Sequence, residues 1–378
     1  MKALLDDLQP TIFGIFNHLH DHPEISWQET KTTEYIENIL LAHQCRVTSF
    51  SDCTGIVGEI GEGSPIIGVR ADLDALWQNV NGEFRANHSC GHDAHMTIVL
   101  GVMLLLTKID RPKGTIRFIF QPAEEKGTGA LKIIEKGIVD DIDFLYGVHL
   151  RPFQEVANGQ ATPAILHGAA RFISGEIVGD DTHGARPHLG INAIEVGADL
   201  VHRLNAIHLN PMVPFSVKMT KLIAGGENLN IIPGSASFGI DLRAQTNKAI
   251  EELTEKVIKA IQTLSHYYSI EIKQTLGANV AAAEVNPEAV AIMTKAIESV
   301  LGEENVLQPT PTSGGEDFHF YTLERPHIKA TMLGLGCDLK PGLHHPQMTF
   351  DHLSLLKGIE ILSSAVIHTL HLHGGSRN

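Results

Sequence analysis

The chain has 378 residues, of which 43% are hydrophobic and 19% are charged, so it is long enough for more than one domain and too apolar to be disordered. Its formal net charge of -15 argues against non-specific binding to nucleic acids or anionic membranes. The N-terminus lacks the apolar run of a signal peptide, no uninterrupted run of about 18 apolar residues suggests a membrane span, and the four cysteines show no paired spacing. We therefore expect a cytoplasmic, globular protein with free thiols.

The first part of the chain predicts an α/β arrangement. Residues 3–20 and 29–43 carry apolar positions at helical spacing, and the segment GIVGEIGEG suits a hairpin. Strands and helices then alternate, in the order strand 65–71, helix 95–109, strand 115–120, helix 128–137 and strand 143–150. This alternation is typical of a doubly wound sheet with helices on its faces.

The pattern changes near residue 168. The segments ARFISGEIVG and SFGIDLRAQ alternate like half-exposed strands, and helices are predicted at about 191–207 and 248–266. After about residue 280 the first pattern returns, with helix 287–301, strand 327–336 and helix 351–370. We therefore predict an α/β domain in two parts, residues 1–167 and 278–378, interrupted by an α+β domain at 168–277.

Side chains that bind metals follow several of the predicted strands. These residues are Asp72 and Asp74, Glu124 and Glu125, His149, and His344 and His345, while HSCGHDAHM precedes a helix. Ligands of open α/β sheets bind at the carboxyl ends of the strands, so we expect these groups at one edge. Each group alone has an ordinary interpretation, such as a helix cap or a solvated acidic pair. Their coincidence at one edge predicts a metal site.

The donor types restrict the metal and the chemistry. Cys90 and His92 flank Gly91, and thiolate with imidazole favours borderline transition metals, so we expect one or two divalent ions of Zn, Mn, Co or Ni. Glu124 and Glu125 are adjacent and point to opposite sides of an extended backbone. This favours two roles, one as a metal ligand and one as a general base for a metal-activated water.

Eight motifs occur in order along nearly the whole chain: RADLDAL, HSCGHDAHM, FQPAEEKGTGA, GVHLRP, THGARPHLGINAI, GGENLNIIPG, GGEDFHFY and LHHP. Together they resemble the dinuclear-metal amidohydrolases related to hippurate hydrolase, N-acyl-amino-acid deacetylases and auxin-conjugate hydrolases, in the aminoacylase/carboxypeptidase clan. The resemblance implies a metallopeptidase-like catalytic domain with an inserted lid and dimerisation domain, and a homodimer. It implies cleavage of the amide bond of N-acyl amino acids or related small amides. A dipeptidase or carboxypeptidase with the same site, and a non-catalytic metal-binding protein, remain as alternatives.

The resemblance also implies a role for individual residues. The metal ligands would be Cys90, His92, Glu125, His149 and His344. Glu124 would be the general base and later the proton donor to the leaving amine, and His183 would stabilise the oxyanion, in dimeric relatives from the neighbouring subunit. Asp72 and Asp74 would orient the ligands.

Two further residues are candidates for substrate binding. Asn230 is a second candidate donor to the oxyanion. Arg243 is either a clamp for a substrate carboxylate or an exposed strand residue. The chain departs from the family pattern at Trp77, Lys126 and His345, where proline, glycine and serine are usual. These departures leave the substrate open.

Overall fold

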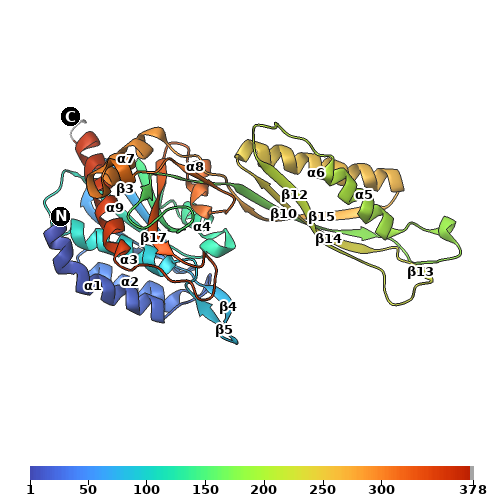
Figure 1. Cartoon of the computed structure of the whole chain (residues 1–378), viewed down its shortest axis with the longest axis horizontal. Helices are drawn as coiled ribbons and strands as arrows, with labels where there is room; N and C mark the ends of the chain where they lie inside the picture. The colour runs from blue at the N-terminus through green and yellow to red at the C-terminus, as the bar shows by residue number, and fades with distance from the viewer. Residues whose placement is uncertain (375–378) are drawn as a thin grey trace. The chain divides into compact units, whose positions relative to one another are not determined.

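The computed structural model describes residues 1–374 and consists of two compact units (Figure 1). Unit 1 comprises Met1–Leu166, Glu284–Pro311 and the segment from Asp317 onward, and unit 2 comprises His167–Ala283 and Thr312–Glu316. The predicted second boundary at residues 277–278 falls inside a strand of unit 2, because β15 (Glu271–Val280) completes the sheet of that unit before the chain returns. The short segment 312–316 also belongs to unit 2, which the sequence pattern did not indicate.

Unit 1 is built on a seven-stranded mixed sheet in the order β1-β2-β6-β3-β7-β17-β8. The strands are β1 (Arg46–Ser49), β2 (Ile56–Glu62), β6 (Gly114–Gln121), β3 (Ile66–Asp72), β7 (Phe144–Pro152), β17 (Lys329–Leu339) and β8 (Ala161–Thr162). The four central strands are parallel, while β1, β2 and β8 run antiparallel to their neighbours. The carboxyl ends of the parallel strands therefore meet at one edge, which is where the ligand-type side chains were predicted.

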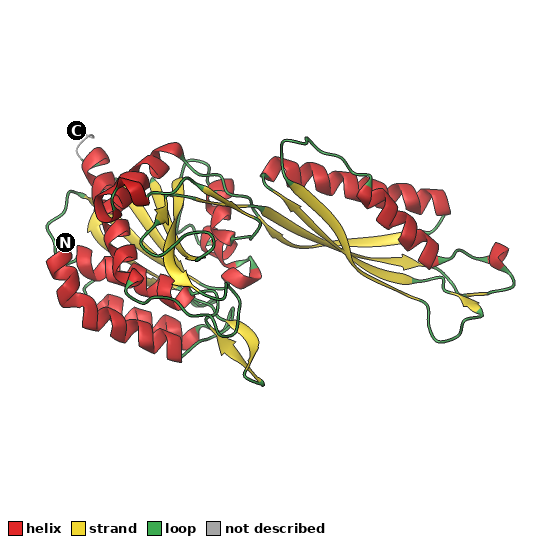
Figure 2. Ribbon diagram, in the orientation of Figure 1, coloured by secondary structure: helices red, strands yellow, loops and turns green. Residues whose placement is uncertain are grey.

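Helices cover the sheet of unit 1 (Figure 2). They are α1 (Lys2–Asp21), α2 (Thr30–Ala42), α3 (His92–Leu106), α4 (Gly129–Glu135), α7 (Pro287–Leu301), α8 (Phe320–Glu324) and α9 (Ser354–His373). Every residue of α3 is buried, as expected for a helix that is apolar on all sides. By length and composition α9 would also suit a membrane span, but 61% of its apolar window is buried by the fold, as in a core helix.

A short hairpin precedes α3 and was not predicted. It consists of β4 (Leu76–Val80) and β5 (Glu83–Asn87), joined by Asn81 and Gly82 with φ angles of 55° and 95°. An Asn-Gly pair readily adopts these left-handed conformations, so the turn signal was present in the sequence. Gln78 of the hairpin donates a hydrogen bond of 2.8 Å to the backbone carbonyl of His344. The hairpin therefore stabilises the backbone of a predicted metal ligand.

Unit 2 is a four-stranded antiparallel sheet in the order β12-β14-β10-β15. The strands β12 (Phe215–Ala224), β14 (Ala236–Ala244) and β10 (Ala169–Val178) pack with β15 against α5 (Ala193–Asn205) and α6 (Asn247–Tyr268) (Figure 2). Along β14 every second residue is buried, because one face of the sheet contacts the helices. The α+β character predicted for this unit is confirmed.

Candidate metal centre

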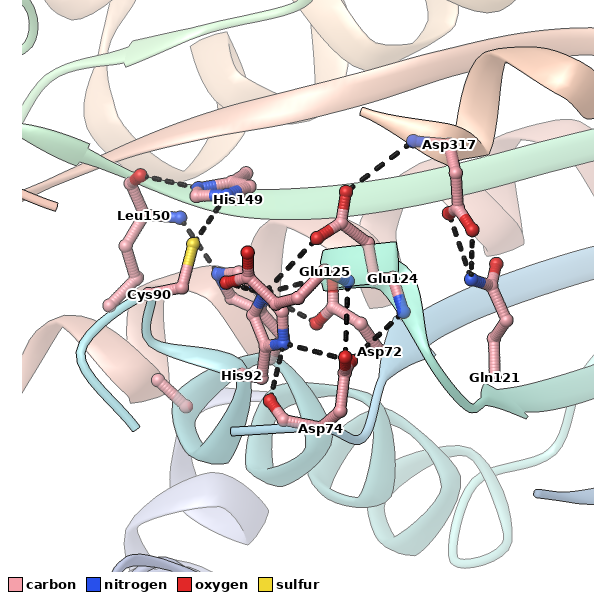
Figure 3. Close-up of polar contacts among 12 residues, drawn as sticks. Asp72, Asp74, Cys90, His92, Gln121, Glu124, Glu125, His149, Leu150 and Asp317 are labelled. Atoms are coloured by element: carbon pink, nitrogen blue, oxygen red, sulfur yellow. Dashed lines mark hydrogen bonds and ion pairs between the residues drawn. The ribbon is translucent and has the colours of Figure 1, made fainter. Parts of the chain in front are cut away.

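The five side chains predicted as metal ligands lie together in unit 1, and Figure 3 shows four of them. The Sγ atom of Cys90 is 3.7 Å from Nε2 of His149 and 3.3 Å from Nε2 of His344. Oε1 of Glu125 is 3.4 Å from the same His344 nitrogen and 4.0 Å from Nε2 of His92. Their donor atoms form two overlapping groups around Cys90, and within each group all atoms lie within 4.8 Å of one another.

Local backbone geometry brings these donors to one place. Gly91, between Cys90 and His92, has a φ of 90°, and a Cβ atom there would lie 3.1 Å from a side-chain carbon of Leu150. A glycine at this position therefore allows both neighbours to face the site. His344 also has a positive φ of 65°, which is uncommon for a residue with a side chain. Its amide donates a hydrogen bond of 2.8 Å to the carbonyl of Ser89, which supports that conformation.

The two buried histidines present the same ring nitrogen to the group. Nδ1 of His92 donates to the carbonyl of Asp74, and Nδ1 of His149 donates to the carbonyl of Leu150, each at 2.7 Å. Within residues 1–374, the buried Nε2 of His92 and Oε1 of Glu125 have no hydrogen-bond partner. Buried polar atoms without partners are uncommon and costly, whereas metal ligands are typically held by a hydrogen bond on the other ring nitrogen. The donor set therefore fits a transition-metal ion.

The electrostatics of His149 agree with this fit. Burial, together with His95 and Arg151, holds the pKa of His149 well below its usual range, so its ring is the neutral form that binds metals. Burial and the nearby Glu125 raise the pKa of the Cys90 thiol. The thiolate, which is the form that binds metals, therefore needs a cation beside it.

Two buried aspartates hold the ligands and the acidic turn in place. Asp72 accepts hydrogen bonds of 2.8 Å from Nδ1 of His95 and from Nη1 of Arg70. Asp74 accepts the backbone N–H groups of both Glu124 and Glu125 at 3.0 Å, as Figure 3 shows. Both carboxylates thus accept hydrogen bonds from protein donors, and their role in orienting the ligands stays a prediction.

The adjacent glutamates lie in a short 3-10 turn, Glu124–Lys126, and face different surroundings. Oε1 of Glu124 accepts the backbone N–H of Asp317 at 3.4 Å, while its Oε2 is 3.9 Å from Nε2 of His92 (Figure 3). The Glu125 carboxylate instead lies against His344. The different contacts support the prediction that the two residues have different roles.

A buried polar network behind the site was not predicted. Arg70 is fully buried in β3 and donates from its three nitrogens to Gln121, Asp72 and Asp317 at 2.8–2.9 Å. Gln121 also donates to Asp317 at 2.8 Å (Figure 3). A signal was available in the sequence, because an arginine inside the apolar strand PIIGVRA requires buried acceptors.

The remaining predicted site residues lie in unit 2. His183 is exposed in β11 (Thr182–His183), which pairs with β13 (Ile231–Ile232), and the carbonyl of Asn230 accepts the N–H of Gly184 at 2.7 Å. Arg243 in β14 donates to Asp241 at 2.8 Å, so its guanidinium already has a carboxylate partner. The roles of His183, Asn230 and Arg243 stay predictions.

Comparisons with known proteins agree with the fold and the site. The profile of peptidase family M20/M25/M40 matches residues 68–368. N-acetyl-L-cysteine deacetylase of Bacillus subtilis is 32% identical over 369 residues, covering 93% of this chain and 86% of the relative. N-acyl-L-amino acid amidohydrolase of Geobacillus stearothermophilus is 30% identical over 297 residues, covering 73% and 79%.

The fold itself recurs in solved structures. A Bacillus subtilis protein described as a dinuclear metal binding peptidase of the M20 family superposes with a TM-score of 0.82 at 24% identity, covering 97% of this chain and 99% of that one. The large mixed sheet and the separate antiparallel sheet are therefore the architecture of that family, as predicted. From these similarities and the geometry of the site, the chain belongs to peptidase family M20/M25/M40 and is a metallohydrolase that acts on amide bonds.

Proposed function

We propose that the protein removes the acyl group from N-acyl amino acids or related small amides, with Glu124 as the general base. The two bacterial relatives are named for this class of substrate and are about 30% identical over most of the chain. The observation that carries the proposal is the acidic turn, in which two adjacent carboxylates both lie near His92 but otherwise contact different groups. Glu125 faces the other candidate ligands, and Glu124 lies between His92 and the N–H of Asp317.

One or two divalent transition-metal ions, held by Cys90, His92, Glu125, His149 and His344, would polarise the amide carbonyl and lower the pKa of a water molecule. Glu124 takes the proton of the attacking water and returns it to the leaving amine. Its side chain is only 10% exposed, so few waters compete for the carboxylate. The hydrogen bond from Asp317 fixes one oxygen and leaves the other on the side of His92.

Three residues of unit 2 complete the proposal. His183, which is exposed, donates to the oxyanion that forms on the amide carbonyl, and Asn230 is a second donor. Arg243 binds a substrate carboxylate, for which it must exchange its present partner Asp241. We further propose a homodimer joined through unit 2, since the edge strand β12 exposes Leu222 and Ile223. Size-exclusion chromatography coupled to light scattering tests the dimer.

The substrate class is tested with a panel of N-acyl amino acids, hippurate-like amides and dipeptides on the purified, metal-loaded protein. We expect hydrolysis of acyl amino acids in preference to dipeptides. Faster hydrolysis of dipeptides would assign a peptidase instead, and no hydrolysis of any of these substrates would refute the proposal.

The base is tested separately. Glu124→Gln should retain the metal and reduce kcat by about 2 to 4 decades, the usual contribution of general acid–base catalysis. Glu135→Gln, at an exposed carboxylate paired with Lys132, is the matched control and should leave kcat unchanged. Elemental analysis should find about one or two metal ions per chain, reduced in Cys90→Ala. Activity that survives in Glu124→Gln would exclude this residue as the base.

A further inference from the structure

A buried carboxylate outside the metal centre contacts the backbone beside the acidic turn. Glu29, at the start of α2, is fully buried. Its Oε1 accepts the N–H of Ala123 at 2.9 Å, and its Oε2 accepts the hydroxyl of Thr54 at 2.6 Å. Burial raises the pKa of this carboxyl, and the hydrogen bonds from Thr54 and Ala123 oppose that rise. An apolar residue would avoid this cost, so the carboxylate needs a reason to be there.

The residue that Glu29 holds has a strained backbone. Ala123 has a φ of 50° and a ψ of 44°, which is the left-handed helical region. For a residue with a side chain this region is unfavourable, and it persists only where the surroundings stabilise it. Ala123 immediately precedes Glu124, so its conformation sets the direction in which the chain enters the acidic turn.

The turn is held from two sides. On one side, Asp74 accepts the N–H groups of Glu124 and Glu125. On the other side, Glu29 accepts the N–H of Ala123. Three consecutive amides, of residues 123, 124 and 125, are thus bound by two buried carboxylates. This places the backbone of the proposed base independently of its side chain.

The loop that carries Thr54, one of the partners of Glu29, is closely packed. Gly55, next to Thr54, has a φ of 98°, and a Cβ atom there would lie 2.7 Å from Cδ of Pro122. The loop that carries Thr54 therefore lies directly against the residue before Ala123. Through its two oxygens, Glu29 ties this loop, the start of α2 and the acidic turn together.

We infer that Glu29 is a positioning residue for catalysis, which keeps Ala123 in its left-handed conformation and so aims Glu124 at the substrate. The inference rests on the proposed role of Glu124. A shift of about 1 Å in a catalytic group reduces the rate by about 100-fold, so loss of the Glu29 carboxylate should reduce kcat by about that factor.

The experiment compares three variants with the wild-type protein. In Glu29→Leu, kcat should fall by about 100-fold, while KM and the metal content stay near those of the wild type. Glu29→Gln keeps a carbonyl oxygen for the N–H of Ala123 and should retain most of kcat. Glu24→Leu is the matched control, because Glu24 is in the same segment and its carboxylate accepts hydrogen bonds from the N–H and the hydroxyl of Thr32 rather than from the acidic turn. It should lose stability but keep kcat.

A second substitution separates positioning from a general effect on folding. Glycine adopts a positive φ without strain, so Ala123→Gly in the Glu29→Leu background should restore part of kcat. Hydrogen exchange of the segment 121–127 gives a readout that needs no substrate. Its amides should exchange faster in Glu29→Leu than in the wild type and in Glu24→Leu.

The outcomes distinguish the two proposals. If the wild-type protein hydrolyses no amide on the panel, the proposed function fails, whatever the exchange data show. If the wild type is active and Glu29→Leu keeps both its kcat and its slow exchange, the inference about Glu29 is wrong. Equal losses of kcat in Glu29→Leu and Glu29→Gln would also overturn it, because only the first removes the acceptor.

Discussion

The buried arginine behind the metal centre allows a quantitative prediction. Arg70→Met removes hydrogen bonds of 2.9, 2.8 and 2.9 Å to Gln121, Asp72 and Asp317, and it leaves two carboxylates buried without their cation. Removal of one partner from a buried ion pair costs about 3–5 kcal/mol. Asp72 keeps the bond from His95, and Asp317 keeps the bonds from Gln121 and from the N–H of Ala130, so we expect the lower part of that range.

Urea unfolding followed by tryptophan fluorescence measures this loss. Both tryptophans, Trp27 and Trp77, lie in unit 1, so the signal reports on the unit that contains Arg70. With a slope of about 2–3 kcal/mol per molar urea, a loss of about 3 kcal/mol lowers the midpoint by about 1–1.5 M. Arg46→Met is the control, because Arg46 is exposed and its ion pair with Glu59 is 3.5 Å long.

The control should lose less than about 1 kcal/mol. Arg70→Lys should lie between the control and Arg70→Met, since one ammonium group cannot replace three directed donors. A loss in Arg70→Met no larger than that in Arg46→Met would refute the reasoning, because the network would then contribute nothing to the stability of unit 1.

Two further predictions concern acid sensitivity and helix packing. Burial and the nearby Arg70 lower the pKa of His319 to about 3, whereas the unfolded chain takes up this proton below about 6.5, so stability falls as the pH falls. Because half of the unfolded chains are already protonated at pH 6.5, the loss between pH 6.5 and pH 5 is about 1.6 kcal/mol. In urea titrations at the two pH values His319→Gln should lack this part of the slope, and an unchanged slope would contradict the prediction. A Cβ atom on Gly101 of α3 would lie 2.3 Å from Cδ1 of the buried Ile359, whereas one on Gly14 of α1 would meet nothing within 4 Å. Thermal denaturation should therefore show a lower midpoint for Gly101→Ala and a slightly higher midpoint for Gly14→Ala, and the same sign for both would contradict the packing argument.

The α/β order of unit 1 and the grouping of the ligand candidates were predictable from the sequence. Buried strands such as 66–72 and 144–152 are short apolar runs, and polar residues directly follow or end them. Parallel strands bring such residues to one edge whatever the details of packing. The strands β12 and β15 were not predicted, because both are exposed along much of their length and the alternation of apolar and polar residues in β12 is interrupted by a register shift between Met219 and Lys221.

The sequence by itself determined which side chains are available for metal binding and catalysis, since Cys90, His92 and the Glu124–Glu125 pair follow from residue type and spacing. Only the tertiary structure decided what holds them. Glu29 accepts the N–H of Ala123, which lies 94 residues later in the chain. Asp317 donates its N–H to Glu124, which lies 193 residues earlier.

 A carboxylate becomes a support for the acidic turn only when folding buries it beside unpaired amide donors. That proximity depends on how distant segments pack, and no local pattern of residues encodes it.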